Sequence, residues 1–168
     1  DSWSFRQKPS GTFKHVLRIP VYLFRWRLGF VLGDRFVLIS HTGRTSGRSF
    51  QSPVEVVEHD TTTHEYIVCS GTGPDADWYR NLKAAPAALI QIGNRRWTPT
   101  QRFLDPDEAA QQFRHYESEH PSAARQLLEM MGNSYDGTDE GRRSMMDRMP
   151  MIAFTDACIR ERENVSPG

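Results

Sequence analysis

The chain has 168 residues, a length typical of one domain that buries a single core. Hydrophobic residues make up 38% of the sequence and charged residues 25%, which excludes a disordered chain. Net charge is zero and the basic residues follow no known reader motif, so we expect no nucleic-acid binding.

The charge is unevenly spread along the chain. Residues 1–50 contain nine Lys and Arg against two Asp, a balance of +7, so residues 51–168 carry −7. The basic part can face an anionic cofactor or a membrane surface, or it can be solvated or pair with the acidic part. Cys69 and Cys158 form no CxxC pair, and we expect two free thiols in a reducing cytoplasm.

The N-terminal part is predicted to hold a flexible polar arm over residues 1–12 and a helix over residues 13–32, bent or restarted at Pro20. The helix contains several arginines, which excludes a membrane span. It either packs on the domain through its apolar side or makes peripheral contact with a membrane surface. A cytoplasmic protein, with or without membrane association, is expected.

β-branched runs separated by turn residues predict the strands. They cover residues 35–41, 51–58, 64–70, 87–92, 95–103 and 151–154. Helical patterns cover residues 75–84, 106–118, 121–131 and 139–147. Asp75 or Asp77 is the expected N-cap of the first of these helices. Residues 160–168 form a polar tail.

This order of elements predicts an α+β fold. Three consecutive strands, a short helix and a hairpin indicate a mostly antiparallel sheet of about six strands, which closes into a barrel with flanking helices. The chain has no βαβ alternation and no GxGxxG, so a Rossmann dinucleotide site is not expected. Residues 13–159 are predicted to form the single domain.

The segment HTGRTSGR, residues 41–48, carries the first chemical signal. Its glycines permit tight turns, and its backbone N–H groups, hydroxyls and two guanidiniums can converge on one anion. It lacks the GK[ST] ending of a Walker A loop. The alternative interpretation is a polar connection between two strands.

The segment SGTGPDADWYRNL, residues 70–82, carries the second signal. A glycine-rich turn before a helix can form a backbone nest for an anion, although the aspartates oppose a phosphate at the helix start. Trp78 and Tyr79 offer a flat aromatic surface, and the alternative for Trp78 is a plug of the core.

No other pattern predicts a reactive centre. The histidines show no HExxH or comparable spacing, so we predict no metal site. The methionines near the C-terminus either pack against the barrel or line an apolar substrate entry. They are Met145, Met146, Met149 and Met151.

Several segments together resemble one family. They are LGFVLGDRFVLISHTGRTSGR, PVEVV, SGTGPDADWYRNLKAAP, IQIGNRRW and PMIAF. Their order and spacing are similar to those of the deazaflavin-dependent nitroreductase and quinone reductase family, over roughly residues 13–156. The resemblance implies a split β-barrel and the cofactor F420, an 8-hydroxy-5-deazaflavin with a phosphate and an oligoglutamate tail.

The resemblance also implies which residues hold this cofactor. The arginine-containing loop within residues 41–48 would bind the anionic tail, and the second strand would lie behind the deazaflavin ring. The glycine-rich turn over residues 70–73 would contact the cofactor through its backbone, and the short helix that follows would close one side of the site. These residues are Thr42, Gly43, Arg44, Ser46, Gly47, Arg48, Pro53, Val54, Ser70, Gly71, Thr72, Gly73, Trp78 and Asn81.

The implied chemistry is hydride transfer from the cofactor to a planar acceptor such as a quinone or a nitroaromatic compound. The protein must stack the acceptor against the cofactor and exclude water. Solvent can supply the proton, and Tyr79 and His41 are the side chains considered as proton donors.

The chain departs from the family at several positions. Thr45 and Phe50 stand where some relatives carry basic residues, and Gly71 stands where others place a lysine. Relatives that reduce nitroimidazoles carry tyrosines near the third helix. The approximate equivalents here are His120, Ala123 and Gln126, which argues against nitro-prodrug reduction.

Two other function classes stay open. One is a non-catalytic barrel that binds a lipid, haem or another apolar ligand, and the other is a reductase that uses FMN. The ligand that copurifies with the protein distinguishes them. A monomer or a homodimer is expected.

Overall fold

The computed structural model describes residues 35–130, 132 and 134–156. The predicted N-terminal arm, the helix over residues 13–32 and the polar tail lie outside them. Within them, no helix has the length and apolar character needed to cross a bilayer. The elements are β1 (Phe36–Thr42), β2 (Ser49–Asp60), β3 (Glu65–Cys69), α2 (Asp77–Ala84), β4 (Leu89–Ile92), β5 (Arg95–Trp97), β6 (Pro99–Phe103), α3 (Pro106–Glu119), α4 (Pro121–Met130), α5 (Asp139–Met145) and β7 (Met151–Asp156).

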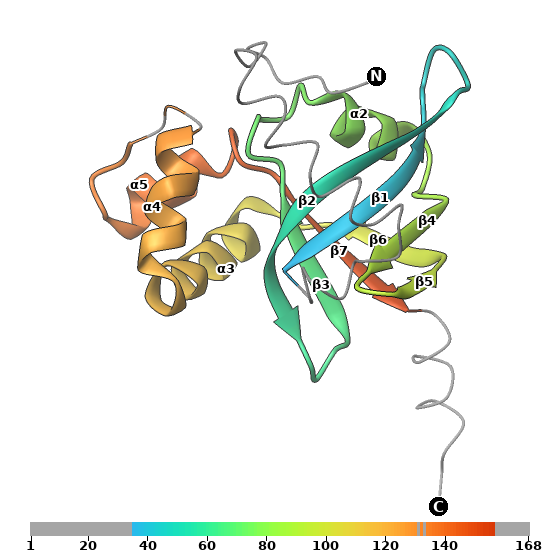
Figure 1. The fold of residues 1–168 in the computed structure, drawn as a ribbon. Coiled ribbons are helices and arrows are strands. Elements are labelled where there is room, and N and C mark those ends of the chain that lie inside the picture. The colour runs from blue at the N-terminus through green and yellow to red at the C-terminus, as the bar shows by residue number, and fades with distance from the viewer. Residues whose placement is uncertain (1–34, 131, 133, 157–168) are drawn as a thin grey trace, which may run out of the picture.

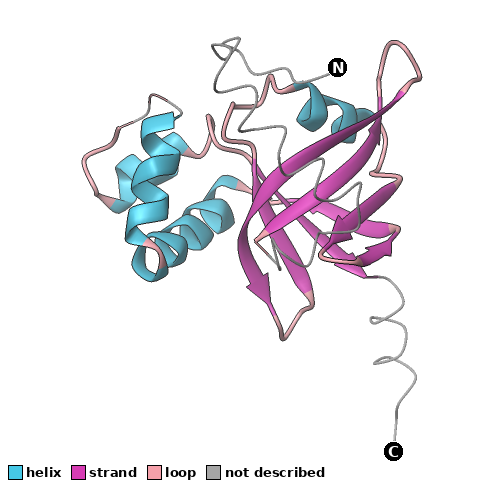
Figure 2. Cartoon of the chain, in the orientation of Figure 1, coloured by secondary structure: helices cyan, strands magenta, loops and turns pink. Residues whose placement is uncertain are grey.

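The strands form one curled antiparallel sheet in the order β5-β4-β1-β2-β3-β7-β6. Every neighbouring pair is antiparallel. The two strands at the ends of this order, β5 and β6, are consecutive in the chain and are separated by Thr98 alone. Figures 1 and 2 show the sheet wrapped around on itself with helices outside it. The predicted α+β split β-barrel is therefore confirmed.

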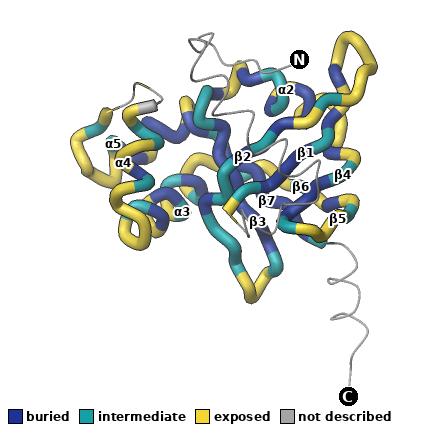
Figure 3. Tube along the Cα trace, viewed as in Figure 1, coloured by how far each residue is buried: buried dark blue, intermediate teal, exposed yellow. Residues whose placement is uncertain are grey.

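The sheet separates two hydrophobic cores. Side chains alternate between the faces of a strand, so Tyr66 and Val68 face the inner core, while Ile67 and Cys69 face the outer one. Because helices α3 to α5 cover the outer face of this part of the sheet, β3 is buried along its whole length. Figure 3 shows this as a dark tube through the centre of the molecule.

The four methionines lie in the outer core with at most 2% of each residue exposed. The predicted packing against the barrel is therefore confirmed for these side chains, which are Met145, Met146, Met149 and Met151.

Strand β2 joins the two halves of the barrel. Its first part, up to Glu55, pairs with β1, and its second part, from Val56, pairs with β3. The register shifts between Val56 and Glu58, which marks a β-bulge. A bulge bends a strand and increases its twist, so one long strand can serve both halves.

The predicted single strand over residues 95–103 is wrong, because the structure divides it into β5 and β6. The first pairs with β4 and the second with β7. Pro99 starts β6, and a proline has no N–H to continue the ladder that β5 makes. The chain therefore changes partner strands at this position.

Neither Asp75 nor Asp77 caps α2, which corrects that prediction. The N-cap is Ala76 and it provides no side-chain hydrogen bond. Asp77 is instead the first helical residue, and its carboxylate accepts a hydrogen bond from Arg44 at 3.0 Å. Interaction with a distant arginine replaces the local cap that the sequence pattern indicated.

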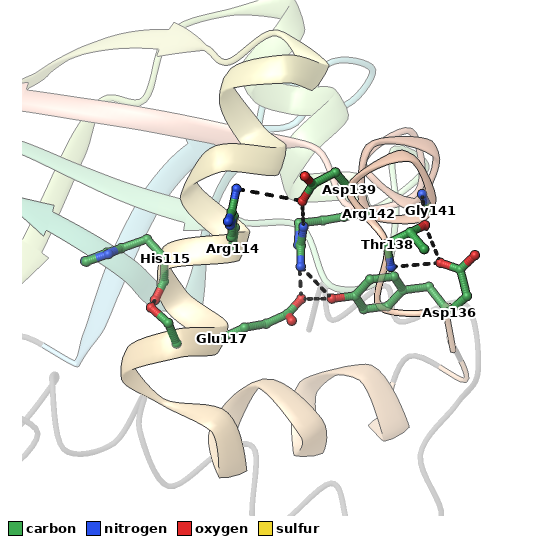
Figure 4. A network of polar contacts seen from close by, with 10 residues as sticks. Arg114, His115, Glu117, Asp136, Thr138, Asp139, Gly141 and Arg142 are labelled. Atoms are coloured by element: carbon green, nitrogen blue, oxygen red, sulfur yellow. Dashed lines mark hydrogen bonds and ion pairs between the residues drawn. The ribbon is translucent and has the colours of Figure 1, made fainter.

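The helical layer is held together by a buried arginine on α5 (Figure 4). Arg142 donates to Asp139 at 2.7 Å and to the Tyr135 hydroxyl at 3.3 Å, and Tyr135 donates in turn to Glu117 on α3. Burial raises the pKa of Tyr135, so its phenol stays protonated and remains a donor. This network ties α5 to α3.

Arg102 on β6 ties the start of α3 to the barrel. Its guanidinium donates to both carboxylate oxygens of Glu65 on β3, at 2.7 and 2.9 Å, and to both oxygens of Glu108, at 2.9 and 2.7 Å. The Glu65 side chain is only 8% exposed. A buried carboxylate is costly without its cation, so this clamp supports the packing of α3 on the sheet.

We expect Arg102→Met to lower the free energy of unfolding by about 2 kcal/mol. Breaking a buried ion pair costs roughly 3–5 kcal/mol, and the smaller value reflects solvent around Arg102, whose side chain is 44% exposed. Urea denaturation at pH 7 measures the change. Arg114→Met is the control, because the Arg114 pair with Asp139 is long and exposed. Equal effects of the two substitutions would contradict the clamp.

Candidate functional site

The loop between β1 and β2 is closed by its own backbone. The Gly43 N–H donates to the carbonyl of Arg48 at 2.8 Å, and the Gly47 N–H donates to the carbonyl of Gly43 at 2.9 Å. Gly47 has a φ of 68°, a left-handed conformation that glycine adopts without strain. A Cβ on Gly43 would lie 2.5 Å from Ser46 Oγ and 2.7 Å from the Phe50 ring, so a larger residue here would displace these two side chains.

Asn81 on α2 binds the β1–β2 loop through side-chain hydrogen bonds. Its Oδ1 accepts two hydrogen bonds from Arg44, one from the backbone N–H at 3.1 Å and one from Nη1 at 2.9 Å. Its Nδ2 donates to Nδ1 of His41 at 3.0 Å. Asn81 is only 3% exposed, so its amide is a buried connection between α2, the loop and β1.

These contacts determine the protonation of His41. Because Oδ1 of Asn81 accepts from two donors, the amide orientation is set and Nδ2 must face the ring. Nδ1 of His41 is then an acceptor without a proton. Nε2 carries the proton and donates to Oγ of Ser52 on β2, at 3.0 Å. The ring is therefore a neutral link between α2 and the second strand.

Burial lowers the pKa of His41 to about 4, against a smaller opposing effect of the Asp77 carboxylate. The residue is 1% exposed. A second ring proton would also place Nδ1–H against the Asn81 amide, so geometry and electrostatics agree on a neutral ring. A buried ring with both nitrogens occupied suits positioning of the loop better than proton donation.

The two arginines of the loop have different surroundings. Arg44 donates to Asn81 and to Asp77, and its side chain is 25% exposed. Arg48 is exposed, and in the part of the chain that the structure describes its guanidinium has no hydrogen bond or ion pair. The exposed hydroxyls of Thr45 and Ser46 lie in the same loop, and the exposed Thr42 is the last residue of β1, just before it.

The glycine-rich turn before α2 satisfies much of its own polar backbone. The Gly71 N–H donates to the carbonyl of Cys69 at 3.1 Å, and the Gly73 N–H donates to that of Ser70 at 3.0 Å. The Ser70 hydroxyl donates to the carbonyl of Gly73 at 2.6 Å. These donors already bind carbonyl groups of the turn. Among residues 70–73, Thr72 alone donates no hydrogen bond within the turn.

The remaining predicted site residues have different surroundings. Pro53 and Val54 are neighbours on β2 and point to opposite faces, and Val54 belongs to the inner core. Trp78 is half-buried against the inner core. Tyr79 is 5% exposed, and its ring lies perpendicular to the rings of Trp78 and Phe103.

The positions that correspond to the nitroreductase tyrosines lie on the helical layer. His120 and Gln126 are exposed at the end of α3 and on α4, and Ala123 is half-buried. In Figure 1 this layer is at the left, whereas the β1–β2 loop is at the upper right.

Sequence reasoning missed two members of the site. The sequence pattern indicates Asp77 only as a possible helix cap, and Ser52 carries no signal in the sequence. Both are defined by partners far along the chain, since Asp77 meets Arg44 and Ser52 meets His41. Among residues 35–156, apart from 131 and 133, no cluster of three His, Cys, Asp or Glu side chains could hold a metal ion.

Comparisons with known proteins point to one family. The sequence model described as F420H(2)-dependent quinone reductase matches residues 27–129, a range that includes the loop, α2 and the Asn81 network. No curated protein matches the chain.

Among solved structures, one described as an F420-H2 dependent reductase (FDR-A) has 23% identity and a TM-score of 0.48, covering 73% of this chain and 95% of its own. One described as a domain-swapped dimer has 20% identity and a TM-score of 0.48, with 80% and 98% covered. One from Clostridium acetobutylicum, described as related to general stress protein 26 of B. subtilis (pyridoxinephosphate oxidase family), has 11% identity and a TM-score of 0.39, with 80% and 83% covered.

We expect the stability of the protein to fall as pH drops from about 6.5 to about 4, in part because of His41. The unfolded chain takes up a proton on this ring near pH 6.5, whereas the folded protein resists it until about pH 4. The contribution is full above pH 6.5 and amounts to about 3 kcal/mol lost across this window. Denaturant titrations at several pH values measure it.

His41→Gln isolates this contribution from those of the carboxylates. The variant is expected to be less stable at pH 7, because the flexible Gln amide holds its acceptor and its donor less rigidly against Asn81 and Ser52 than the imidazole ring does. It is also expected to show a flatter pH dependence than the wild type between pH 6.5 and 4. His120→Gln, at an exposed position, is the matched control. Parallel stability curves for wild type and His41→Gln would show that His41 is not buried neutral.

Proposed function

We propose that this chain, which belongs to the F420H(2)-dependent quinone reductase family, transfers a hydride from reduced coenzyme F420 to a quinone. Membership in the family makes the chain an oxidoreductase of the F420-dependent class. The quinone acceptor and the residues that hold the cofactor are our proposal for this chain.

One observation carries the proposal: the β1–β2 loop presents donors that match the anionic groups of this cofactor. Arg48 offers a guanidinium that no described residue neutralises, and Thr42, Thr45 and Ser46 offer exposed hydroxyls. Guanidinium and hydroxyl groups are the side chains that bind phosphate and carboxylate well. The residues present therefore fit a ligand with a phosphate and a glutamate tail.

When bound, the deazaflavin supplies the hydride. The chain supplies binding, orientation and exclusion of water. Arg48 and the hydroxyls beside it would hold the anionic part, and the half-buried Trp78 on α2 would offer an aromatic surface for a planar ring.

The proton that completes quinone reduction comes from solvent in this proposal. His41 is buried with both ring nitrogens occupied. Tyr79 is packed between aromatic rings, and burial raises the pKa of its phenol. Neither group has the surroundings of a residue that exchanges protons with a substrate.

A fluorescence titration of oxidised F420 with the purified protein tests the cofactor, followed by oxidation of reduced F420 with a soluble naphthoquinone. We expect saturable binding with a dissociation constant on the order of 1 μM and quinone-dependent turnover. Arg48→Ala is expected to weaken binding about tenfold, the value of one charge-assisted hydrogen bond.

Arg80→Ala is the control, because Arg80 is an exposed arginine on α2 outside the network. Absence of F420 binding to the wild type would overturn the cofactor assignment, and flavin absorbance of the purified protein would indicate FMN instead. Binding without turnover on any quinone would overturn the acceptor class.

A further inference from the structure

The position of the β1–β2 loop depends on one side chain outside it. Among the side chains described, Asn81 is the one that accepts the backbone N–H of Arg44, and the same oxygen also accepts the Arg44 guanidinium. Both bonds come from residue 44, at the start of the loop, whereas Arg48 lies at its end. Arg44 is therefore the residue that ties the loop to Asn81, whereas Arg48 is the residue whose guanidinium has no partner among the described residues.

The loop transmits this tether to Arg48 through its backbone. Gly43, next to Arg44, donates its N–H to the carbonyl of Arg48 and accepts from Gly47. The N–H of Arg48 also donates to Ser46 Oγ at 3.3 Å. Displacement of Arg44 would therefore shift the backbone from which the Arg48 guanidinium extends.

The Arg44 guanidinium is a poor candidate for a ligand contact. Two of its nitrogens already bind protein oxygens, and one of these belongs to a carboxylate at 3.0 Å. An anion that approached this guanidinium would compete with Asp77 and would be repelled by it. Arg48 has no such competitor among the described residues.

We propose that Asn81 and Arg44 are positioning residues for the β1–β2 loop, and that Arg48 makes the contact with the anionic part of the ligand. This inference rests on the proposed function for the identity of the ligand. Within the β1–β2 loop, Arg44 then serves to position the backbone and Arg48 serves to bind the ligand. Asn81 does not contact the ligand in this assignment but binds the loop that does.

The Asn81 position permits a test by substitution with aspartate. Asn81→Asp keeps an oxygen that accepts both bonds from Arg44. It loses the donor to His41, but a carboxylate there can accept from a proton-bearing Nδ1 instead. The ring would then carry a proton on Nδ1, and Nε2 could accept from the Ser52 hydroxyl. Asn81→Ala removes the acceptor for Arg44 altogether. Comparison of the two variants therefore distinguishes the effect of the hydrogen bonds to Arg44 from the effect of losing the amide group.

The experiment is a double-mutant cycle on F420 binding, with wild type, Asn81→Ala, Arg48→Ala and the double variant. If Asn81 acts through the position of Arg48, each single variant weakens binding about tenfold and the double variant is no weaker than the more affected single one. We expect Asn81→Asp to bind within about threefold of the wild type.

Additive losses in the cycle would overturn the inference, because they would mean that Asn81 and Arg48 contribute independently. Wild-type affinity in Arg48→Ala would overturn it also. Arg80→Ala combined with Asn81→Ala is the control pair and should give additive effects.

Two readouts do not depend on the cofactor. Tryptic cleavage after Arg44 and Arg48 should be faster in Asn81→Ala than in the wild type and unchanged in Asn81→Asp. The ¹⁵N resonances of the His41 ring should indicate a neutral ring with its proton on Nε2 in the wild type at pH 7, and a proton on Nδ1 in Asn81→Asp. If the wild type fails to bind F420, the proposed function fails, and these readouts still decide whether Asn81 positions the loop.

Discussion

The buried amide of Asn81 is the interaction on which the candidate site depends. It accepts two hydrogen bonds from Arg44 and donates one to His41, and it is almost completely removed from water. A buried amide with unmet hydrogen bonds is costly, so the surrounding groups are constrained to the positions that satisfy it. The loop, α2 and β1 meet at this one side chain, and His41 extends the connection to Ser52 on β2.

This connection explains why two segments far apart in the chain act together. The segments TGRTSGR and DWYRNL are separated by two strands, β2 and β3, and the antiparallel sheet brings their ends to the same rim of the barrel. One segment contributes the donors and the other contributes the acceptor. The loop thereby presents Arg48 to solvent from a fixed backbone, which is the arrangement that recognition of an anion requires.

Arginines perform a similar structural task elsewhere in the fold. Arg102 ties α3 to β3 through Glu108 and Glu65, and Arg142 ties α5 to α3 through Tyr135 and Glu117. A guanidinium has five donors in a fixed plane, so one side chain can bind acceptors from two elements at once. The two hydrophobic cores set the layers of the molecule, and these polar ties set how α2, α3 and α5 lie on the barrel.

The sequence by itself determined the class of fold, because β-branched runs and turn residues depend on neighbours along the chain. It also indicated the arginine loop and the α2 segment, since their residue types carry their chemistry. It did not reveal that the predicted strand over residues 95–103 divides at Pro99, that Asp77 binds Arg44 and does not cap α2, or that Arg44 and Arg48 have different surroundings. Only the tertiary structure decided these, because each depends on a partner strand or side chain distant in sequence, and a buried hydrogen bond overrides a local preference when no water can replace it.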